Sequence, residues 1–166
     1  MRFQGTLYRA LNPLYAREPL SGHGAALYGG RFNARGTAAL YLTLDVVTAI
    51  REANQVGSLQ PTTLVSYDAD IDDLFDSRDV AALTTCGMTA ADLAVATWRD
   101  EMRATGRSRT QAFAAELLAA GFAGLLVRSF ARGSSEADLN LVLWRWSDSL
   151  PHRLTVIDDE GRLLGR

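Results

Sequence analysis

Arg31 is the first residue whose type and spacing indicate ligand binding. It lies in the segment Gly29–Asn33 (GGRFN). Glycines let a backbone approach a ligand closely, and an arginine beside them can grip a phosphate with a bidentate fork. The same spacing also fits a surface turn whose arginine forms a salt bridge. The segment is neither a GxxxxGK[ST] phosphate loop nor a GxGxxG dinucleotide fingerprint.

Two residues in apolar segments are further candidates for ligand binding. Arg9 interrupts an apolar stretch, so its charge must point to solvent, meet a partner or face a ligand. The ring of Tyr41 could stack on a planar ligand, or Tyr41 is a core residue whose hydroxyl has a protein partner. The residues alone leave these alternatives open.

Three polar side chains complete the set of candidates. Glu52 follows Arg51 in a predicted helix, where a carboxylate is either solvated or able to bind ribose hydroxyls and stabilise positive charge at an anomeric carbon. Ser129 ends an apolar segment, as serines often do at turns, and no GxSxG motif surrounds it. Asn140 lies in an alternating segment, where an inward amide needs partners or offers them to a ligand.

Composition restricts the class of protein. The 166 residues are 48% hydrophobic and 22% charged, as in one ordinary globular domain. The net charge of −2 argues against a dedicated nucleic-acid surface. Cys86 is the only cysteine and there are two histidines, so we expect no disulfide and no metal. With no apolar signal core and no run of about 18 apolar residues, we expect a cytoplasmic protein without a membrane partner.

Two other groups of residues are predicted to be structural. The aspartates between residues 68 and 76 superficially resemble a calcium loop, but they lack the glycine and terminal glutamate of an EF-hand. We expect them in a solvated loop and the start of a helix. Four aromatic residues are expected in the core or at an interface, namely Trp98, Phe113, Trp144 and Trp146.

Hydrophobic patterning predicts the elements that position the candidates. Strands are predicted at residues 5–10, 38–42, 62–68, 122–129, 138–146 and 152–157. The segment 11–37 is a long irregular stretch, a kind of loop that often carries function. The stretch 71–120 is predicted to be helical, and residues 131–137 form a flexible loop.

Caps and apolar stripes locate the helices. The helix that carries Glu52 should begin after a cap at Thr43 or Asp45. The apolar stripe expected to face inward comprises Val46, Ala49, Ile50 and Ala53, and Glu52 lies off this stripe. Two capping boxes pair Thr89 with Asp92 and Ser108 with Gln111. One later helix is expected to be lined by Ala91, Val95, Trp98 and Met102, and the next by Phe113, Leu117 and Ala120, ending near Gly121.

Strands near both ends of the chain, with helices between them, predict an α+β fold. We expect a single domain over residues 1–166, with small mixed sheets and a central helical insertion. Its core should span about residues 5–146, followed by a C-terminal strand and tail at 147–166.

In this order, the candidate residues resemble those of the RES domain family, which is named for its characteristic Arg, Glu and Ser. The resemblance covers most of the chain. It rests on the segments Leu7–Arg9, Gly29–Asn33 with Gly36, Leu40–Leu42, Ala49–Glu52, Leu125–Ser129 and Asn140–Trp144. The family usually has Pro-Ser at Arg128-Ser129 and often Trp-Asn-Pro at Phe32–Ala34, and Ser134 and Ser135 are nearby alternatives to Ser129.

This resemblance implies an activity and a partner. RES proteins are toxins of bacterial toxin–antitoxin pairs, neutralised by Xre-type helix-turn-helix antitoxins, and their fold resembles NAD-dependent ADP-ribosyltransferases. Members consume NAD⁺ by hydrolysis or by transferring ADP-ribose to a protein, in some cases an enzyme of phosphoribosyl pyrophosphate synthesis. An antitoxin that covers the NAD⁺ site is therefore expected.

The resemblance also implies roles for the candidates. Glu52 and Arg31 are expected to be catalytic, with Glu52 stabilising the developing oxocarbenium ion. Arg9 and Arg31 would hold the diphosphate and adjacent ribose, and Tyr41 would pack on the nicotinamide side. Ser129 would place the ribose or the nicotinamide amide. Asn33 and Asn140 complete the expected NAD⁺ contacts.

Some alternatives stay open at this point. Water or a protein side chain could accept the ADP-ribosyl group, although Arg51 before Glu52 removes the acidic pair typical of arginine-directed transferases. A protein of a different class, a non-enzymatic partner-binding module, would lack NAD⁺ binding that depends on Arg31. A calcium-binding or nucleic-acid-binding protein has little support in the residues.

Overall fold

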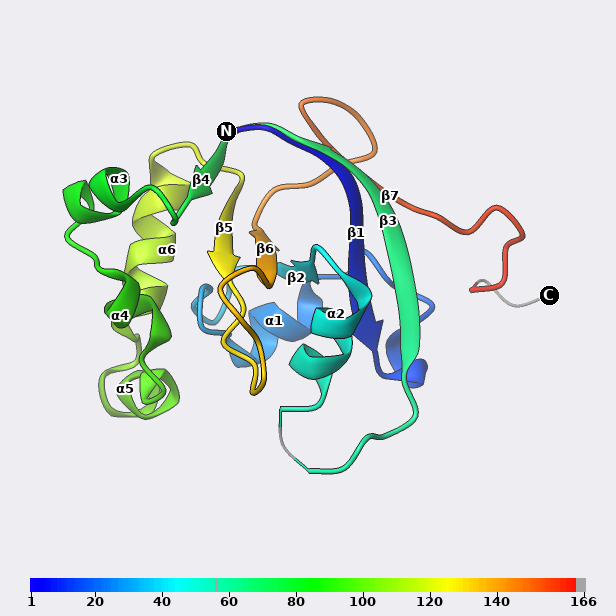
Figure 1. Ribbon diagram of the computed structural model, residues 1–166, viewed down its shortest axis with the longest axis horizontal. Helices are drawn as coiled ribbons and strands as arrows, with labels where there is room; N and C mark the ends of the chain where they lie inside the picture. Colours follow the sequence, from blue (N-terminus) through cyan, green and yellow to red (C-terminus); the bar gives the residue numbers. More distant parts are fainter. Residues whose placement is uncertain (56, 164–166) are drawn as a thin grey trace.

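The strands of the chain form one sheet, in a computed structural model that describes residues 1–55 and 57–163 (Figure 1). In sheet order the strands are β4 (Leu74–Asp76), β5 (Gly124–Arg128), β6 (Leu139–Leu143), β2 (Leu40–Thr43), β1 (Phe3–Leu11), β3 (Thr63–Ile71) and β7 (His152–Val156). Neighbouring strands are antiparallel except β4 and β5, which are parallel.

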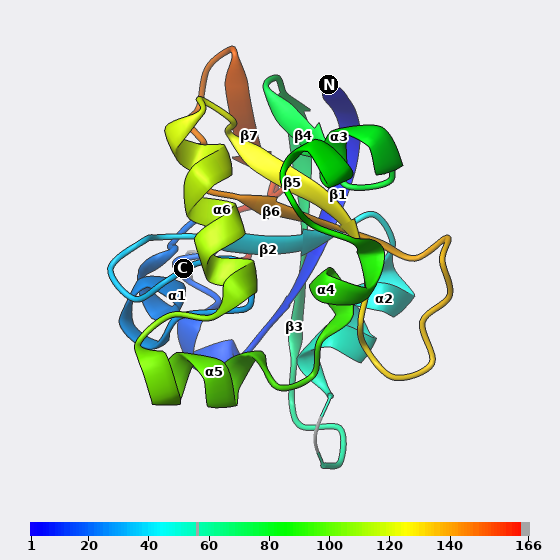
Figure 2. The ribbon, with the colours of Figure 1, turned by 90° about the vertical axis from the view of Figure 1, so that its left-hand side faces the viewer.

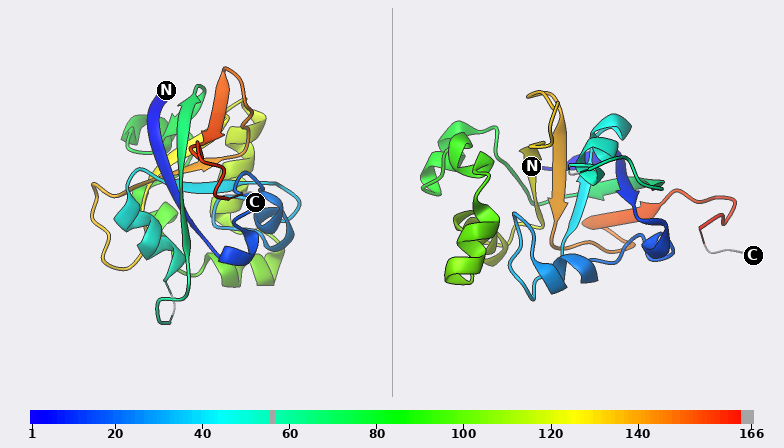
Figure 3. Two further views of the ribbon diagram at one scale, coloured as in Figure 1. Left: turned by 90° about the vertical axis from the view of Figure 1, so that its right-hand side faces the viewer. Right: turned by 90° about the horizontal axis from the view of Figure 1, so that it is seen from below.

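The α+β class is confirmed, but the strands do not form separate small sheets. β2 is the reason, because it pairs with β1 through Tyr8 and Thr43 and with β6 over its whole length. It thereby joins the N-terminal strands to the C-terminal ones. Figure 3 shows β1, β3 and β7 side by side at one end of this continuous sheet.

Helices lie in the β1–β2, β2–β3 and β4–β5 connections. They are η1 (Pro13–Tyr15), α1 (His23–Tyr28), α2 (Val46–Ala53), α3 (Val80–Thr85), α4 (Ala90–Ala94), α5 (Trp98–Thr105) and α6 (Arg109–Ala119). The irregular stretch 11–37 therefore contains a short helix, α1, that the sequence did not predict. None of the helices among the described residues is both long and apolar enough to span a membrane.

Local side-chain signals located the starts of α2, α4 and α6. Asp45, rather than Thr43, caps α2 by accepting from the Thr48 amide. Both predicted capping boxes are present, at the starts of α4 and α6. The one helix predicted through Ala91, Val95 and Trp98 is wrong, because Val95 takes an extended conformation (φ −51°, ψ 121°) that ends α4 before α5 begins.

The inner face of α2 differs from the predicted apolar stripe. Thr48 and Ala49 are buried, whereas Val46 is 37% exposed. The Thr48 hydroxyl donates to Asp45 and, at 3.2 Å, to Asp138, so the helix faces the protein with a polar surface. Glu52 follows Thr48 by one helical turn and consequently faces inward.

The core lies on both faces of the sheet, as strand alternation requires. Leu126 and Leu141 belong to one cluster of buried residues, whereas their neighbours Leu125 and Val142 belong to the other. α6 covers the second face and adds Phe113 and Leu117 to it (Figure 2).

The acidic run does not form the predicted solvated loop and helix start. Asp68 and Asp70 lie in β3, and residues 74–76 form β4. Asp70 is nearly buried and accepts from the Arg2 guanidinium at 2.7 and 2.8 Å, while Asp68 pairs with Arg153 at 2.8 Å. Arg2, just before β1, and Arg153 of β7 therefore neutralise the acidic positions of β3.

Candidate functional site

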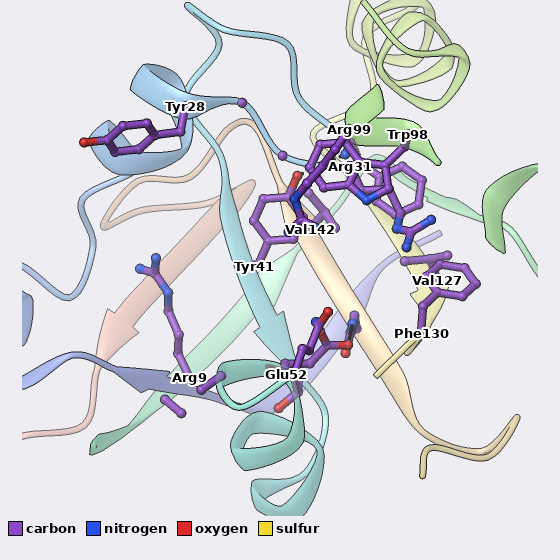
Figure 4. Close-up of a pocket in the computed structure, with 18 of the residues that line it drawn as sticks. Arg9, Tyr28, Arg31, Tyr41, Glu52, Trp98, Arg99, Val127, Phe130 and Val142 are labelled. Atoms are coloured by element: carbon purple, nitrogen blue, oxygen red, sulfur yellow. Dashed lines mark hydrogen bonds between the residues drawn. The ribbon is translucent and has the colours of Figure 1, made fainter. Parts of the chain in front are cut away.

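A cavity of about 560 Å³ opens between α2, α5 and the sheet. Its walls come from β1, β2 and β6, from the GGRFN segment, and from Phe130 after β5. Figure 4 shows Glu52 at one side of this cavity and Arg31, Trp98 and Arg99 at another. Segments distant in the sequence thus meet around one space.

The Glu52 carboxylate is held by three hydrogen bonds. Its Oε1 accepts from the Ser129 hydroxyl and from the Asn140 amide, each at 2.5 Å. Its Oε2 accepts from the exposed Gln55 amide at 2.5 Å. Three of the predicted site residues, Glu52, Ser129 and Asn140, are therefore brought into direct contact.

The pairing of β5 with β6 places the two donors to Glu52. Val127 pairs with Asn140, and Ser129 follows the end of β5, where its amide donates to the Asp138 carbonyl at 2.7 Å. Asp138 also binds Thr48 of α2, which holds that helix against the ends of both strands.

Among the candidate serines, Ser129 makes the contact with Glu52. It is 1% exposed and lies behind the carboxylate rather than in the cavity wall. The Ser134 hydroxyl donates to the Ser129 hydroxyl at 3.0 Å, and Ser135 instead caps the loop by bonding Asp138. The loop after β5 thus supports Glu52 through Ser129.

Asn140 presents an acceptor without a partner. The residue is 9% exposed, and among the described residues its Oδ1 is the buried side-chain atom that lacks a hydrogen bond. The amide cannot reverse to satisfy this oxygen, because Nδ2 must face the Glu52 carboxylate. Asn140 lines the cavity, but this oxygen is enclosed by protein, so Asn140 acts on Glu52 through Nδ2 and does not expose Oδ1 to the cavity.

The break between α4 and α5 holds Arg31. Its guanidinium donates to the carbonyls of Leu93 and Val95, at 3.1 and 2.6 Å, and lies 4.7 Å from the centre of the Phe130 ring. These carbonyls are available because α4 ends there without continuing its hydrogen bonds. Burial lowers the pKa of Arg31, the positive charge of Arg99 lowers it further, and Glu52 raises it.

Tyr41 and Asn33 together build the GGRFN turn. The Tyr41 hydroxyl donates to Asn33 Oδ1 at 2.7 Å and accepts from the Phe32 amide at 3.0 Å, and burial raises the Tyr41 pKa. The Asn33 amide donates to the carbonyls of Ala25 and Thr37. Tyr41 lines the cavity, whereas Asn33 is 1% exposed and lies beneath it.

Arg9 lines the same cavity but lies apart from Arg31. Its guanidinium donates to the Pro19 carbonyl at 3.3 Å, beside the Tyr67 hydroxyl that donates to the same oxygen. Burial lowers the Arg9 pKa. Figure 4 shows Arg9 on the other side of Tyr41 from Arg31, so the two expected phosphate ligands are not adjacent.

The cavity wall includes residues that sequence reasoning missed, among them Trp98, Arg99 and Phe130. Trp98 was assigned to the core and is indeed 6% exposed, but its ring also faces the cavity beside Arg31 and Arg99. No local signal distinguishes Arg99 from other arginines of the helical region. Its position depends on where α5 begins, and the break that starts α5 was not predicted.

The chain is similar to known proteins in sequence and in fold. The sequence model of the RES domain family matches residues 6–164. The fold is similar to that of a chain in the crystal structure of the M. tuberculosis MbcT–MbcA toxin–antitoxin complex, with a TM-score of 0.67 and 22% identity. The similarity covers 95% of this chain and 84% of that chain. A search of curated proteins finds no match.

Proposed function

The chain belongs to the RES domain family, and on that premise we propose that it binds NAD⁺ and cleaves the bond between nicotinamide and ribose. One observation carries the proposal. The carboxylate of Glu52 is fixed by Ser129 and Asn140 at a cavity whose other charged side chains are arginines. Such a site offers a negative charge to a developing cation and positive charges to phosphates.

The chemistry requires a single carboxylate. Nicotinamide leaves NAD⁺ as a neutral molecule, with the electron pair of the broken bond, so no acid has to protonate it. Positive charge then develops on the ribose, where Glu52 stabilises it. This differs from most glycoside hydrolases, in which a second carboxyl group protonates the leaving oxygen. Preorganised charge of this kind contributes several kcal/mol to lowering a barrier.

The neighbours of Glu52 have supporting roles in this proposal. The hydrogen bonds from Ser129 and Asn140 orient Oε1 before substrate arrives. Asn140 also lines the cavity and contacts the ribose or the carboxamide. Oε2 is bound by the exposed Gln55, which a ribose hydroxyl can displace.

Arg31, Tyr41 and Asn33 shape the remainder of the proposed site. Arg31 binds phosphate with the guanidinium donors that the Leu93 and Val95 carbonyls leave free. The Tyr41 ring packs on the nicotinamide side, and Asn33 acts from below by holding the Tyr41 hydroxyl. Arg9 contacts the part of the dinucleotide that reaches the β1 side of the cavity.

The acceptor of the ADP-ribosyl group is water or a nucleophilic side chain of a target protein. Water gives free ADP-ribose, and a target gives a modified protein, for which an enzyme of phosphoribosyl pyrophosphate synthesis is a candidate. Arg51, beside Glu52, pairs with Asp138 at 3.5 Å and supplies no second carboxylate. An arginine acceptor is accordingly the less favoured choice.

We further propose that the protein is the toxin of a toxin–antitoxin pair. The family membership and the similarity to a chain of a toxin–antitoxin complex support this. An Xre-type antitoxin that covers the cavity would neutralise it. Co-expression with an Xre-type antitoxin that binds this protein should then abolish NAD⁺ consumption, and an active, NAD⁺-accessible complex would contradict the proposal.

Release of nicotinamide from NAD⁺ tests the reaction. The wild-type protein is compared with Glu52→Gln, which keeps the shape of the side chain and removes its charge, each with and without bacterial lysate. The matched control is Glu116→Gln, at an exposed position of α6 outside the cavity. Release that needs no lysate and is lost only in Glu52→Gln indicates a glycohydrolase.

Release that requires lysate, together with a labelled protein band, indicates an ADP-ribosyltransferase. Glu52→Gln protein that consumes NAD⁺ at the wild-type rate would overturn the role of Glu52. No release under either condition would leave a partner-binding module as the function of this fold.

A further inference from the structure

The cavity has a strongly uneven charge. In a chain whose net charge is −2, its described lining carries one carboxylate, Glu52, and five arginines. The arginines are Arg9, Arg31, Arg35, Arg99 and Arg103. A pocket lined by one sign of charge attracts a ligand of the opposite sign. The arginines of this cavity are therefore candidates for binding the phosphates of a dinucleotide.

Two of the arginines gather around one indole ring. The guanidinium carbon of Arg99 lies 4.5 Å from the centre of the Trp98 ring, and that of Arg31 lies 5.9 Å from it. Figure 4 shows the side chains of Arg31 and Arg99 next to each other at this side of the cavity. Their proximity also appears in the lowered pKa of Arg31, to which Arg99 contributes after burial.

Neither guanidinium forms a salt bridge with a carboxylate of the described residues. Among the described residues, no Asp or Glu oxygen lies within 4.0 Å of either guanidinium, whereas Arg103 is paired with Asp100. Arg31 is partly satisfied by two carbonyls. Two adjacent cations without an anion repel each other, and an anionic ligand converts that repulsion into attraction.

The start of α5 carries charges of both signs. Trp98 and Arg99 are the first two residues of the helix. The Thr97 hydroxyl donates to Glu101 at 3.4 Å instead of capping the first turn. Asp100 and Glu101 lie in the first turn and offset the positive end of the helix dipole, so the cationic character of this corner comes from the two guanidinium groups.

We infer that Arg99 and Arg31, around Trp98, form the diphosphate-binding subsite of the cavity, with Arg99 as a residue that determines affinity for phosphorylated ligands. This inference rests on the proposed function for the identity of the ligand as a dinucleotide. It replaces Arg9 as the expected partner of Arg31, since Arg9 lies across Tyr41 from it. The glycosidic bond is then left at the Glu52 side.

Binding of partial ligands tests the subsite, measured in the Glu52→Gln background so that the glycosidic bond of nicotinamide riboside stays intact. Calorimetric titration would compare inorganic pyrophosphate, ADP-ribose and the phosphate-free nicotinamide riboside on the whole chain. Arg99→Gln should weaken binding of the first two about tenfold, as the loss of one charge-assisted hydrogen bond predicts. Nicotinamide riboside should bind alike with and without Arg99→Gln. Arg99→Lys, which keeps the charge, should recover part of the loss.

Arg107→Gln is the matched control, because Arg107 lies just after α5 and outside the cavity lining. Thermal unfolding of each variant establishes that the fold is intact. Unchanged pyrophosphate binding in Arg99→Gln, or an equal loss for nicotinamide riboside, would overturn the subsite.

These measurements can reject the subsite without rejecting the proposed reaction, and the reverse. Arg99-dependent binding of pyrophosphate and ADP-ribose without any nicotinamide release would retain the subsite and reject the reaction. Nicotinamide release together with ADP-ribose binding that is insensitive to Arg99 would retain the reaction and reject the subsite.

Discussion

The Ser129 hydroxyl donates a 2.5 Å hydrogen bond to the carboxylate of Glu52, 77 residues away in the chain. The same hydroxyl accepts from Ser134 and from the Ala131 amide. A loop that follows β5 therefore determines the orientation of a carboxylate on α2. In catalytic sites, residues behind the reacting group commonly decide whether it is preorganised.

We expect Ser129→Ala to lower kcat/KM for nicotinamide release by about tenfold, because it removes a charge-assisted hydrogen bond to Glu52. Ser134→Ala should have a smaller effect, since Ser134 contacts Ser129 and not Glu52. Steady-state kinetics of both variants, with thermal unfolding as a check on folding, tests this. An equal or larger loss in Ser134→Ala would place the important contact elsewhere.

Gly30→Ala should destabilise the protein by about 1–3 kcal/mol, the usual cost of overpacking. A Cβ at Gly30 would overlap the Tyr41 hydroxyl and lie 2.6 Å from Asn33 Oδ1, which are the two atoms that hold the GGRFN turn. Gly24→Ala is the control, because its Cβ meets open space in α1. Chemical denaturation measures both, and equal midpoints would contradict the packing argument.

Acid should remove a stabilising contribution from Asp70. Hydrogen bonds from Arg2 and then Gln4 lower the Asp70 pKa to about 2 in the folded protein. Because the folded pKa lies below the unfolded value of about 3.9, this stabilisation is present above about pH 4 and is lost as the pH falls towards 2.

Asp70→Asn should therefore flatten the stability profile between about pH 4 and 2. Urea unfolding of the variant and the wild type at a series of pH values checks this. Asp100→Asn is a suitable control, because the Asp100 side chain is 75% exposed in its pair with Arg103. A steep acid slope retained in Asp70→Asn would contradict the role of Asp70.

Local chemistry in the sequence determined much of the fold. Most strands follow from apolar or alternating segments, and the starts of α2, α4 and α6 follow from Asp45, Thr89 and Ser108. These signals depend only on residues a few positions apart, so they do not depend on how the remainder of the chain is arranged. The family resemblance likewise rested on residues in order, and the family match confirms it.

Tertiary structure alone decided how the candidate residues meet. Glu52 was placed off the inward stripe of α2 because apolar residues were expected to face the protein. Hydrogen bonds from Thr48 to Asp138 instead turn a polar face inward. The contact of Glu52 with Ser129 then depends on the position of β5, which no local pattern encodes.

Tertiary structure also decided which arginines lie close to each other. Arg9 and Arg31 are equally plausible phosphate ligands in the sequence, but they lie on opposite sides of Tyr41. The carbonyls that hold Arg31 and the position of Arg99 both depend on the break between α4 and α5 at Val95. The sequence therefore predicted the candidate residues and the helix caps. The partners of each charged side chain could not be predicted, because they lie on segments distant in sequence that only long-range packing brings together.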